Sequence, residues 1–282
     1  MIERLLGFLK LRTQPVSEAA CSLEDRGYAC LRGVLSGSEI EALRAEVERV
    51  FEELPPDVRI EARPAEDMAM FRYEMLNRSA LCQEMVAHPT ILETIEPLLG
   101  EDCHVIANTA WRNPAAQLGM EKGQFWHIDA GPHVPRPKGT KWPAEIPYPV
   151  FAIGIHILLQ DQTLAEGPTG VIPGSHRSGQ IPPFDRVRDA DLDYEGEPCR
   201  PILGDAGDVL LFVSDIWHRR MPTLEGDAGR FFLQVHYGRR DIAQRLRPTT
   251  ATGQLSKEAV DRANTERERT IIGLHEPRFY DG

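Results

Sequence analysis

The chain has 282 residues, of which 41% are hydrophobic, so it is long and apolar enough to bury a substantial core. Its 32 basic and 43 acidic side chains give a formal net charge of −11, which argues against general binding to nucleic acid. The cysteines are odd in number and show no Cys-x-x-Cys spacing, which argues against a zinc knuckle or a disulfide framework. They are Cys21, Cys30, Cys82, Cys103 and Cys199. Because the chain also shows no apolar run long enough for a signal peptide or a membrane span, we expect a cytoplasmic protein without a membrane partner.

The first hundred residues predict one short strand and then helices. The strand is expected within residues 25–35, where an apolar stretch lies between glycines. Two of the helices begin with a capping box, in which Ser or Thr is followed three residues later by Glu. The helices are expected from Ser38 (with Glu41) to Leu54, from about 79 to 87, and from Thr90 (with Glu93) to Gly100.

After Gly100 the apolar residues form short β-rich runs, separated by long loops rich in proline and glycine. Strands are expected at 103–111, 125–129, 151–159, 171–172, 209–213 and 230–237, and a last helix at 256–264. The prolines of 131–149 exclude a strand there. This order predicts a mainly β fold with added helices, a double-sheet jelly roll of the cupin type, or double-stranded β-helix. We expect a single domain over 1–282, with helices at about 36–100, the jelly-roll core at about 101–240 and a tail at 241–282.

A metal site is suggested by the segment that contains His127 and Asp129. On a strand, alternate side chains point to the same face, so the imidazole and the carboxylate would project together. His218, just after the apolar run 209–213, is the candidate third ligand from a neighbouring strand. Two histidines and one carboxylate with the opposite side left open are typical of non-haem Fe(II) oxygenases. The His-x-Asp spacing alone does not establish a metal site: the alternative is a solvated Asp129 beside a half-buried His127.

A second candidate site is Arg230, at the start of the final apolar strand. A guanidinium group stays charged, so its burial is costly unless a carboxylate pairs with it. No acidic residue near it in the sequence is an obvious partner, which favours a bound carboxylate ligand held by a bidentate contact. The alternative is an arginine on the surface of an edge strand.

These residues stand in a characteristic order of motifs. The order is His127-x-Asp129, then Gly167-Pro168-Thr169-Gly170-Val171-Ile172-Pro173-Gly174-Ser175-His176, then Gly207-Asp208-Val209-Leu210-Leu211-Phe212 leading to His218, then Arg230. Over about residues 23–240 the sequence resembles the phytanoyl-CoA dioxygenase family of Fe(II)/2-oxoglutarate oxygenases. Gly27-Tyr28, followed by Leu31 to Ser36, is similar to the usual opening of that family.

The resemblance implies a double-stranded β-helix core with His127, Asp129 and His218 as iron ligands and catalytic residues. It implies Arg230 as the anchor of the C5 carboxylate of 2-oxoglutarate. An enzyme of this kind uses O2 to hydroxylate an unactivated C–H bond of a small molecule, and it releases succinate and CO2. The carboxylate of Asp129 argues against a halogenase, because halogenating relatives carry a small residue there. We expect His176 to be structural.

Two positions depart from the family pattern. Relatives often carry a small hydroxyl residue two positions after the distal histidine, where this chain has Arg220. They often place a Trp on the strand before the Gly-Pro turn, where this chain has His156. We therefore expect His156 to contact the cosubstrate, with a satisfied core histidine as the alternative, and we take Arg112 as a further candidate for cosubstrate binding.

Two other functions stay open at this stage: a cupin-like Zn or Mn enzyme, and a metal-binding protein without oxygenase activity. The sequence leaves the substrate and the oligomeric state open. Loop 131–149 carries Arg136, Lys138 and Lys141 directly after the expected metal ligands, in a chain that is acidic as a whole. We expect this loop to line the mouth of the pocket and to favour an anionic substrate with a carboxylate, phosphate or phosphonate group. A solvated loop whose charges face water is the alternative.

Overall fold

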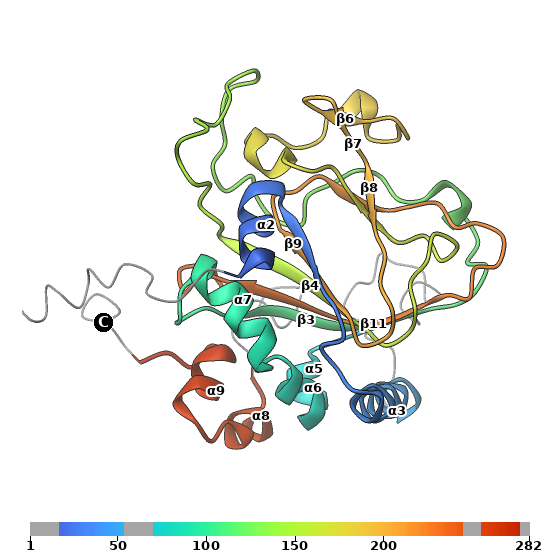
Figure 1. Cartoon of the computed structure of the whole chain (residues 1–282). Coiled ribbons are helices and arrows are strands. Elements are labelled where there is room, and N and C mark those ends of the chain that lie inside the picture. The colour runs from blue at the N-terminus through green and yellow to red at the C-terminus, as the bar shows by residue number, and fades with distance from the viewer. Residues whose placement is uncertain (1–16, 54–69, 245–254, 277–282) are drawn as a thin grey trace, which may run out of the picture.

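The computed structural model describes residues 17–53, 70–244 and 255–276. Two antiparallel sheets face each other in a jelly roll, and helices pack on the outside of the larger sheet (Figure 1). The mainly β fold with added helices predicted from the sequence is therefore confirmed. Among the described helices, none combines the length and the apolar composition that a transmembrane segment needs.

The elements follow one another with the helices concentrated near both ends of the chain. The strands are β1 (Tyr28–Leu31), β2 (Phe71–Tyr73), β3 (His104–Asn113), β4 (Ala152–Leu158), β5 (Thr169–Val171), β6 (Asp193–Tyr194), β7 (Glu197–Pro198), β8 (Arg200–Ile202), β9 (Val209–Val213), β10 (His218–Arg220) and β11 (Arg230–Gly238). The helices are α2 (Glu18–Arg26), α3 (Gly37–Glu53), α5 (Met75–Arg78), α6 (Ala80–Met85), α7 (Pro89–Leu99), α8 (Lys257–Arg262) and α9 (Glu266–Ile271). Short 3-10 turns lie at Met120–Lys122, Ser175–Ser178 and Phe184–Arg186.

The larger sheet has six strands in the order β1-β9-β4-β11-β3-β2, and the smaller has the order β10-β5-β8. Every strand pair in both sheets is antiparallel. The long strand β11 lies between β4 and β3, so its residues are flanked on both sides by other strands. An isolated bridge between His127 and His218 extends β10 of the smaller sheet by one pairing.

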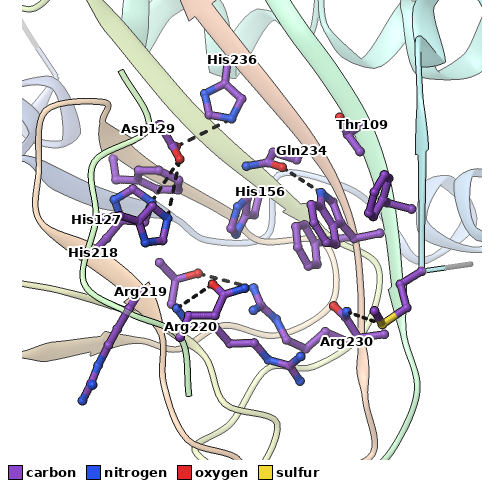
Figure 2. A pocket seen from close by; sticks show the side chains of 18 of the residues that line it. Thr109, His127, Asp129, His156, His218, Arg219, Arg220, Arg230, Gln234 and His236 are labelled. Atoms are coloured by element: carbon purple, nitrogen blue, oxygen red, sulfur yellow. Dashed lines mark hydrogen bonds and ion pairs between the residues drawn. The ribbon is translucent and has the colours of Figure 1, made fainter. Parts of the chain in front are cut away.

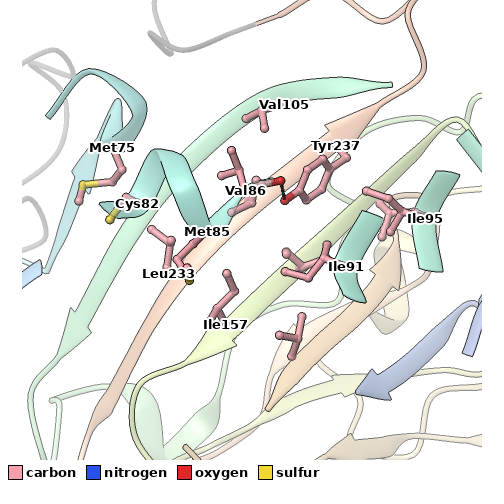
Figure 3. Packing of buried hydrophobic residues seen from close by; sticks show 14 of the residues in the cluster. Met75, Cys82, Met85, Val86, Ile91, Ile95, Val105, Ile157, Leu233 and Tyr237 are labelled. Carbon is pink, nitrogen blue, oxygen red and sulfur yellow. Dashed lines mark hydrogen bonds between the residues drawn. The ribbon is translucent and has the colours of Figure 1, made fainter. Parts of the chain in front are cut away.

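The outer face of the larger sheet forms the main hydrophobic core with the helices (Figure 3). On β4 the outward residues are Ile153, Ile155 and Ile157, and on β11 they include Leu233 and Val235. Figure 3 shows Ile91 and Ile95 of α7 and Met85 of α6 over these strands. Because side chains alternate along a strand, the other face is left for the interior of the jelly roll.

The inner face packs against the smaller sheet through a second cluster. Leu158, Leu210, Phe212 and Phe232 from the larger sheet meet Val171, Ile202 and Ile216 from the smaller sheet and its connections. This cluster closes one part of the space between the sheets, and the remaining space between them holds the candidate site.

Most predicted elements are confirmed within a few residues, but three local predictions were wrong. Residues 125–129 do not form a regular strand, because only His127 makes a bridge. The capping box of α3 is formed by Ser36 and Glu39, two residues before the predicted pair: the Glu39 carboxylate accepts from the Ser36 N–H at 2.7 Å. Helix α7 begins at Pro89 with His88 as its N-cap, so Thr90 lies inside the helix and does not cap it.

Tyr237 links β11 to the end of α6 and gives a test of the core. Its buried hydroxyl donates to the carbonyl of Val86 at 2.9 Å (Figure 3). We predict that Tyr237→Phe lowers the free energy of unfolding by about 1–2 kcal/mol, because a buried carbonyl loses its partner. Urea denaturation measures this change. Tyr28→Phe is the control: the Tyr28 ring is half-buried, so a change within about 0.5 kcal/mol is expected there, and an equal loss in both variants would contradict the assignment.

Candidate active site

His127, Asp129 and His218 come together at one edge of the space between the sheets (Figure 2). One ligand atom from each lies within 4.8 Å of the others. Oδ1 of Asp129 is 3.3 Å from Nε2 of His218 and 3.9 Å from Nε2 of His127. The three residues predicted from the sequence can therefore share one metal ion.

Backbone pairing brings these ligands together from distant parts of the chain. The N–H of His127 donates to the carbonyl of His218 at 2.9 Å, and the N–H of His218 donates back to the carbonyl of His127 at 2.9 Å. Two residues further on, the N–H of Asp129 donates to the carbonyl of Ser214 at 3.2 Å. The segment is therefore extended and fixed at the two ligand positions although it forms no regular strand.

Each histidine is oriented by a carbonyl two residues before it. Nδ1 of His127 donates to the carbonyl of Phe125 at 2.8 Å, and Nδ1 of His218 donates to the carbonyl of Ile216 at 3.0 Å. Because a carbonyl only accepts, both rings carry their proton on Nδ1 when neutral and present an unprotonated Nε2 to the metal position.

The charges in the cluster suit a divalent cation. Burial would raise the pKa of Asp129, but the imidazoles of His218, His236 and His127 lower it below its ordinary value. Burial lowers the pKa of His127, and His218 lowers it further. Burial opposes protonation of His218, but Asp129 raises its pKa above the ordinary value. A metal ion bound by these three residues would take the place of that proton, since the ligand must be neutral imidazole.

The cluster opens into a cavity of about 570 Å³ between the two sheets. Alternate residues of β3 and β11 form one wall of it, and His156 of β4 lies beside them (Figure 2). From β11 the wall residues are Arg230, Phe232, Gln234 and His236, and from β3 they are Ala107, Thr109, Trp111 and Asn113. A cavity of this size is in the ordinary range for binding small molecules.

Arg230 lies at the end of this cavity away from the metal ligands. It is 6% exposed, and its guanidinium lies 4.7 Å from the ring centre of Phe232. Within the described part of the chain its side chain makes one hydrogen bond, a long one of 3.4 Å from Nη2 to Oγ1 of Thr169. Its Nε has no hydrogen-bond partner, and within the described ranges no carboxylate lies at ion-pair distance. Burial and the neighbouring Arg220 guanidinium lower the pKa of Arg230 to about 9. These contacts leave the guanidinium ready for an anionic partner.

The structure places His156 in the cavity and Arg112 outside it. His156 lies between the rings of Phe212 and Phe232, with centroid distances of 5.3 and 4.3 Å. Its Nδ1 has no hydrogen-bond partner among the residues that the structure describes. Burial and Arg230 hold the pKa of His156 well below its ordinary value, so the ring is neutral. Arg112 is exposed on the other face of β3, where its guanidinium lies 4.9 Å from the ring centre of Phe51. The expectation that Arg112 binds the cosubstrate is therefore not supported.

Loop 131–149 is also placed differently from the prediction. None of its residues lines the cavity that holds the metal ligands. Lys141 pairs with Glu195 at 2.9 Å, and the Arg136 guanidinium lies over the ring of Trp142. Its charges therefore serve contacts on another part of the surface, and the predicted position at the pocket mouth was wrong.

Several polar residues that face the cavity were not predicted from the sequence, among them Thr169, Gln234 and His236. Thr169 lies directly opposite Arg220 in the pairing of β5 with β10. Arg220 occupies the position where relatives often carry a small hydroxyl residue, and Thr169 supplies a hydroxyl on the neighbouring strand. Gln234 and His236 follow Arg230 at steps of two along β11, a spacing that could have revealed them. Nε2 of His236 lies 3.8 Å from Oδ2 of Asp129.

Comparisons with known proteins show the family of the chain and proteins of similar fold. The model of the phytanoyl-CoA dioxygenase (PhyH) family matches residues 23–221. An ectoine dioxygenase of Nocardia farcinica is 26% identical over 224 residues, which cover 72% of this chain and 71% of the relative. The solved structure of the epimerase SnoN with Fe3+, alpha ketoglutarate and nogalamycin RO has a TM-score of 0.62 at 19% identity, covering 83% of this chain and 90% of SnoN. HygX from Streptomyces hygroscopicus, with nickel and 2-oxoglutarate, has a TM-score of 0.61 at 15% identity, with coverage of 82% and 90%.

The chain belongs to the phytanoyl-CoA dioxygenase family. It is a non-haem iron enzyme of the 2-oxoglutarate-dependent dioxygenase class. The names of its relatives point to small-molecule substrates for those proteins.

We predict that Asp129→Ala lowers the affinity for Co(II) by at least about a hundredfold, because the carboxylate is the only charged donor of the cluster. Titration of the metal-free protein followed by Co(II) absorption measures the affinity, and circular dichroism checks that the fold is retained. Asp185→Ala, at an exposed carboxylate outside the cavity, is the matched control and should bind Co(II) as the wild type does. Equal Co(II) affinity in the Asp129 variant and the wild type would rule out this metal site.

Proposed function

We propose that His127, Asp129 and His218 bind Fe(II), and that Arg230 binds the C5 carboxylate of 2-oxoglutarate. The enzyme then hydroxylates an unactivated C–H bond of a small molecule, with release of succinate and CO2. The observation that carries the proposal is that an open two-histidine, one-carboxylate cluster faces the same cavity as a buried arginine that has no carboxylate partner among the described residues.

The donor set fits Fe(II) with positions left for other ligands. Two imidazole nitrogens and one carboxylate approach from one side, and the other side opens into the cavity. When bound, Fe(II) and 2-oxoglutarate supply the oxidising chemistry, in which O2 is reduced as 2-oxoglutarate loses CO2. The protein's own part is to hold these groups and to exclude water from the reaction, and the apolar rings of Phe212 and Phe232 serve that end.

The Arg230 end of the cavity supports a carboxylate site. A guanidinium can form a bidentate contact with a carboxylate, and here Thr169 adds a hydroxyl beside it. Relatives often carry a small hydroxyl residue two positions after the distal histidine. We propose that the Thr169 hydroxyl takes its place here and helps to bind the carboxylate. Arg220 is engaged elsewhere, since its guanidinium donates to Oε1 of Gln117 at 2.7 Å and to the carbonyl of Glu166 at 3.2 Å.

His156 supports the same placement of the cosubstrate. Figure 2 shows it between the metal ligands and Arg230, on the inner face of β4. A neutral imidazole at this point offers a polar contact without a competing charge. We propose that it lies alongside bound 2-oxoglutarate, and its unpartnered Nδ1 is the atom that such a contact would satisfy.

The chain is further proposed to act as one oxygenase domain in the cytoplasm. Residues of α3, α7 and α9 share one buried apolar cluster with β4, β9 and β11, which supports a single unit. All five cysteines are free thiols, as expected for a reducing compartment.

The anionic character of the substrate stays a prediction. Loop 131–149 does not support it, because no residue of that loop lines the cavity. One relative is named for ectoine, and SnoN is solved in complex with nogalamycin RO, so proteins similar to this chain are associated with chemically different small molecules.

Succinate formation tests the proposed reaction. The protein is incubated with 2-oxoglutarate, ascorbate and a panel of small metabolites, with Fe(II), Zn(II) or Mn(II), in air or under argon. We expect succinate only with Fe(II) and O2, and an increase when a member of the panel is hydroxylated. Turnover of a metabolite with Zn(II) or Mn(II) under argon would instead indicate the cupin-like hydrolase or isomerase.

We predict that Arg230→Ala weakens 2-oxoglutarate binding at least about thirtyfold, because a charge-assisted bidentate contact is lost. Thr169→Val, which removes one neutral hydrogen bond, should weaken it about fivefold. Calorimetric titration of 2-oxoglutarate into the Ni(II)-loaded protein gives both values. Arg112→Ala is the matched control, since that arginine lies on the opposite face of β3, and its Kd should equal that of the wild type. A loss in the Arg112 variant equal to that in the Arg230 variant would contradict the assignment.

A further inference from the structure

One side of the cavity is an aromatic wall formed by residues of β2 and β3. The indole of Trp111 is stacked on the ring of Phe232, with a centroid distance of 6.0 Å and an interplanar angle of 8°. The ring of Phe71 packs against the same indole at 5.0 Å. Trp111 is therefore held between two neighbouring rings, and its position in the wall is fixed.

This indole fixes the orientation of the Gln234 side chain. Nε1 of Trp111 donates to Oε1 of Gln234 at 2.7 Å. An indole N–H can only donate, so the amide oxygen must face Trp111 and the amide NH2 must face the other way. Figure 2 shows Gln234 between this contact and the side of the cavity that holds Asp129 and His236. Gln234 is half-buried, and among the described residues its NH2 group has no acceptor, so a donor is presented to the cavity.

A hydroxyl lies beside this donor on the neighbouring strand. Thr109 of β3 is directly opposite Gln234 of β11 in the register, and both line the cavity. The part of the chain that the structure describes gives the Thr109 hydroxyl no side-chain hydrogen bond. Cross-strand neighbours lie about 5 Å apart, so the two groups can address the same part of one ligand.

The charges of the cavity limit what can bind here. Among the residues that the structure describes, Asp129 is the only carboxylate that lines the cavity, and it belongs to the candidate metal cluster. Of the cationic side chains in the lining, Arg230 lies at the cosubstrate end, Arg220 is held by Gln117 and Glu166, and the Arg219 guanidinium lies over the ring of Trp126. A cationic ligand would therefore lose its hydration without finding a partner, whereas an uncharged oxygen acceptor would gain a hydrogen bond.

We propose that Gln234 and Thr109, with the wall of Phe71 and Trp111, form the substrate-orienting site. It takes an uncharged molecule with an apolar body and an oxygen that accepts a hydrogen bond, such as a ketone or an amide. The inference rests on the proposed function, which supplies Fe(II) and 2-oxoglutarate beside this site. Gln234 acts as the specificity-determining donor, and Trp111 acts as a positioning residue that keeps the donor turned toward the cavity.

The test uses four probes of similar size with the protein loaded with Zn(II) and 2-oxoglutarate: acetophenone, benzoate, benzylammonium and toluene. NMR titration gives the Kd of each. We expect acetophenone to have the lowest Kd of the four probes. Its Kd should be at least about fivefold below that of toluene, which is the effect expected of one hydrogen bond. Gln234→Leu should remove most of the preference for acetophenone over toluene, and the near-isosteric Thr109→Val should reduce it by a smaller factor. Arg112→Ala, outside the cavity, should keep it.

Three results would overturn the inference. The first is a wild type that binds toluene or benzylammonium as tightly as acetophenone, or binds none of the probes. The second is tightest binding of benzoate, which would support an anionic substrate. The third is a 2-oxoglutarate Kd that rises more than about twofold in Gln234→Leu, which would place Gln234 in the cosubstrate site. If the wild type does not bind 2-oxoglutarate at all, the proposed function is refuted. Calorimetric titration of 2-oxoglutarate into the Zn(II)-loaded protein shows this before any probe is added.

Discussion

The candidate site depends on the backbone bridge between His127 and His218. Two hydrogen bonds of 2.9 Å join these residues, which the sequence separates by the whole of β4, β5 and β9. The bridge sets both imidazoles side by side, with ring centroids 4.3 Å apart, and the bond from Asp129 to Ser214 places the carboxylate beside them. Because the backbone makes these contacts, the ligands are held close together before any metal binds.

Strand β11 then connects this cluster to the rest of the molecule. Its outward residues, Leu233, Val235 and Tyr237, belong to the core with the helices, and its inward residues run from Arg230 to His236 along the cavity. A shift of the register by one residue would bury the wrong set, so the core under the helices also fixes the direction of the site residues. Gly154 on β4 lies opposite His236, and a Cβ there would come within 2.9 Å of the Phe212 ring, so a side chain at this position would crowd the cavity wall.

The fold could be predicted from the sequence, and so could the three residues that the structure brings together as a candidate metal cluster, because both depend on patterns visible in the sequence itself. Alternation and proline-rich loops indicated the sheets, and His127, Asp129 and His218 stood in the order of a known family. Residues whose place depends on strand pairing were harder to predict. Arg112 pairs with Phe231, an outward residue, so a difference of one position along β3 separates it from the cavity residues Trp111 and Asn113. Thr169 could be recognised only from the register of β5 with β10, and the Lys141 pair with Glu195 joins two loops that no local pattern connects.

The central claim is that one cavity holds a metal at His127, Asp129 and His218 and a carboxylate at Arg230. A crystal structure of the protein with Ni(II) and 2-oxoglutarate tests it most directly. The account predicts anomalous density for nickel in contact with all three side chains, and the C5 carboxylate of 2-oxoglutarate in hydrogen-bond contact with Arg230 and Thr169. Nickel bound at other residues, or a 2-oxoglutarate carboxylate held away from Arg230, would contradict it.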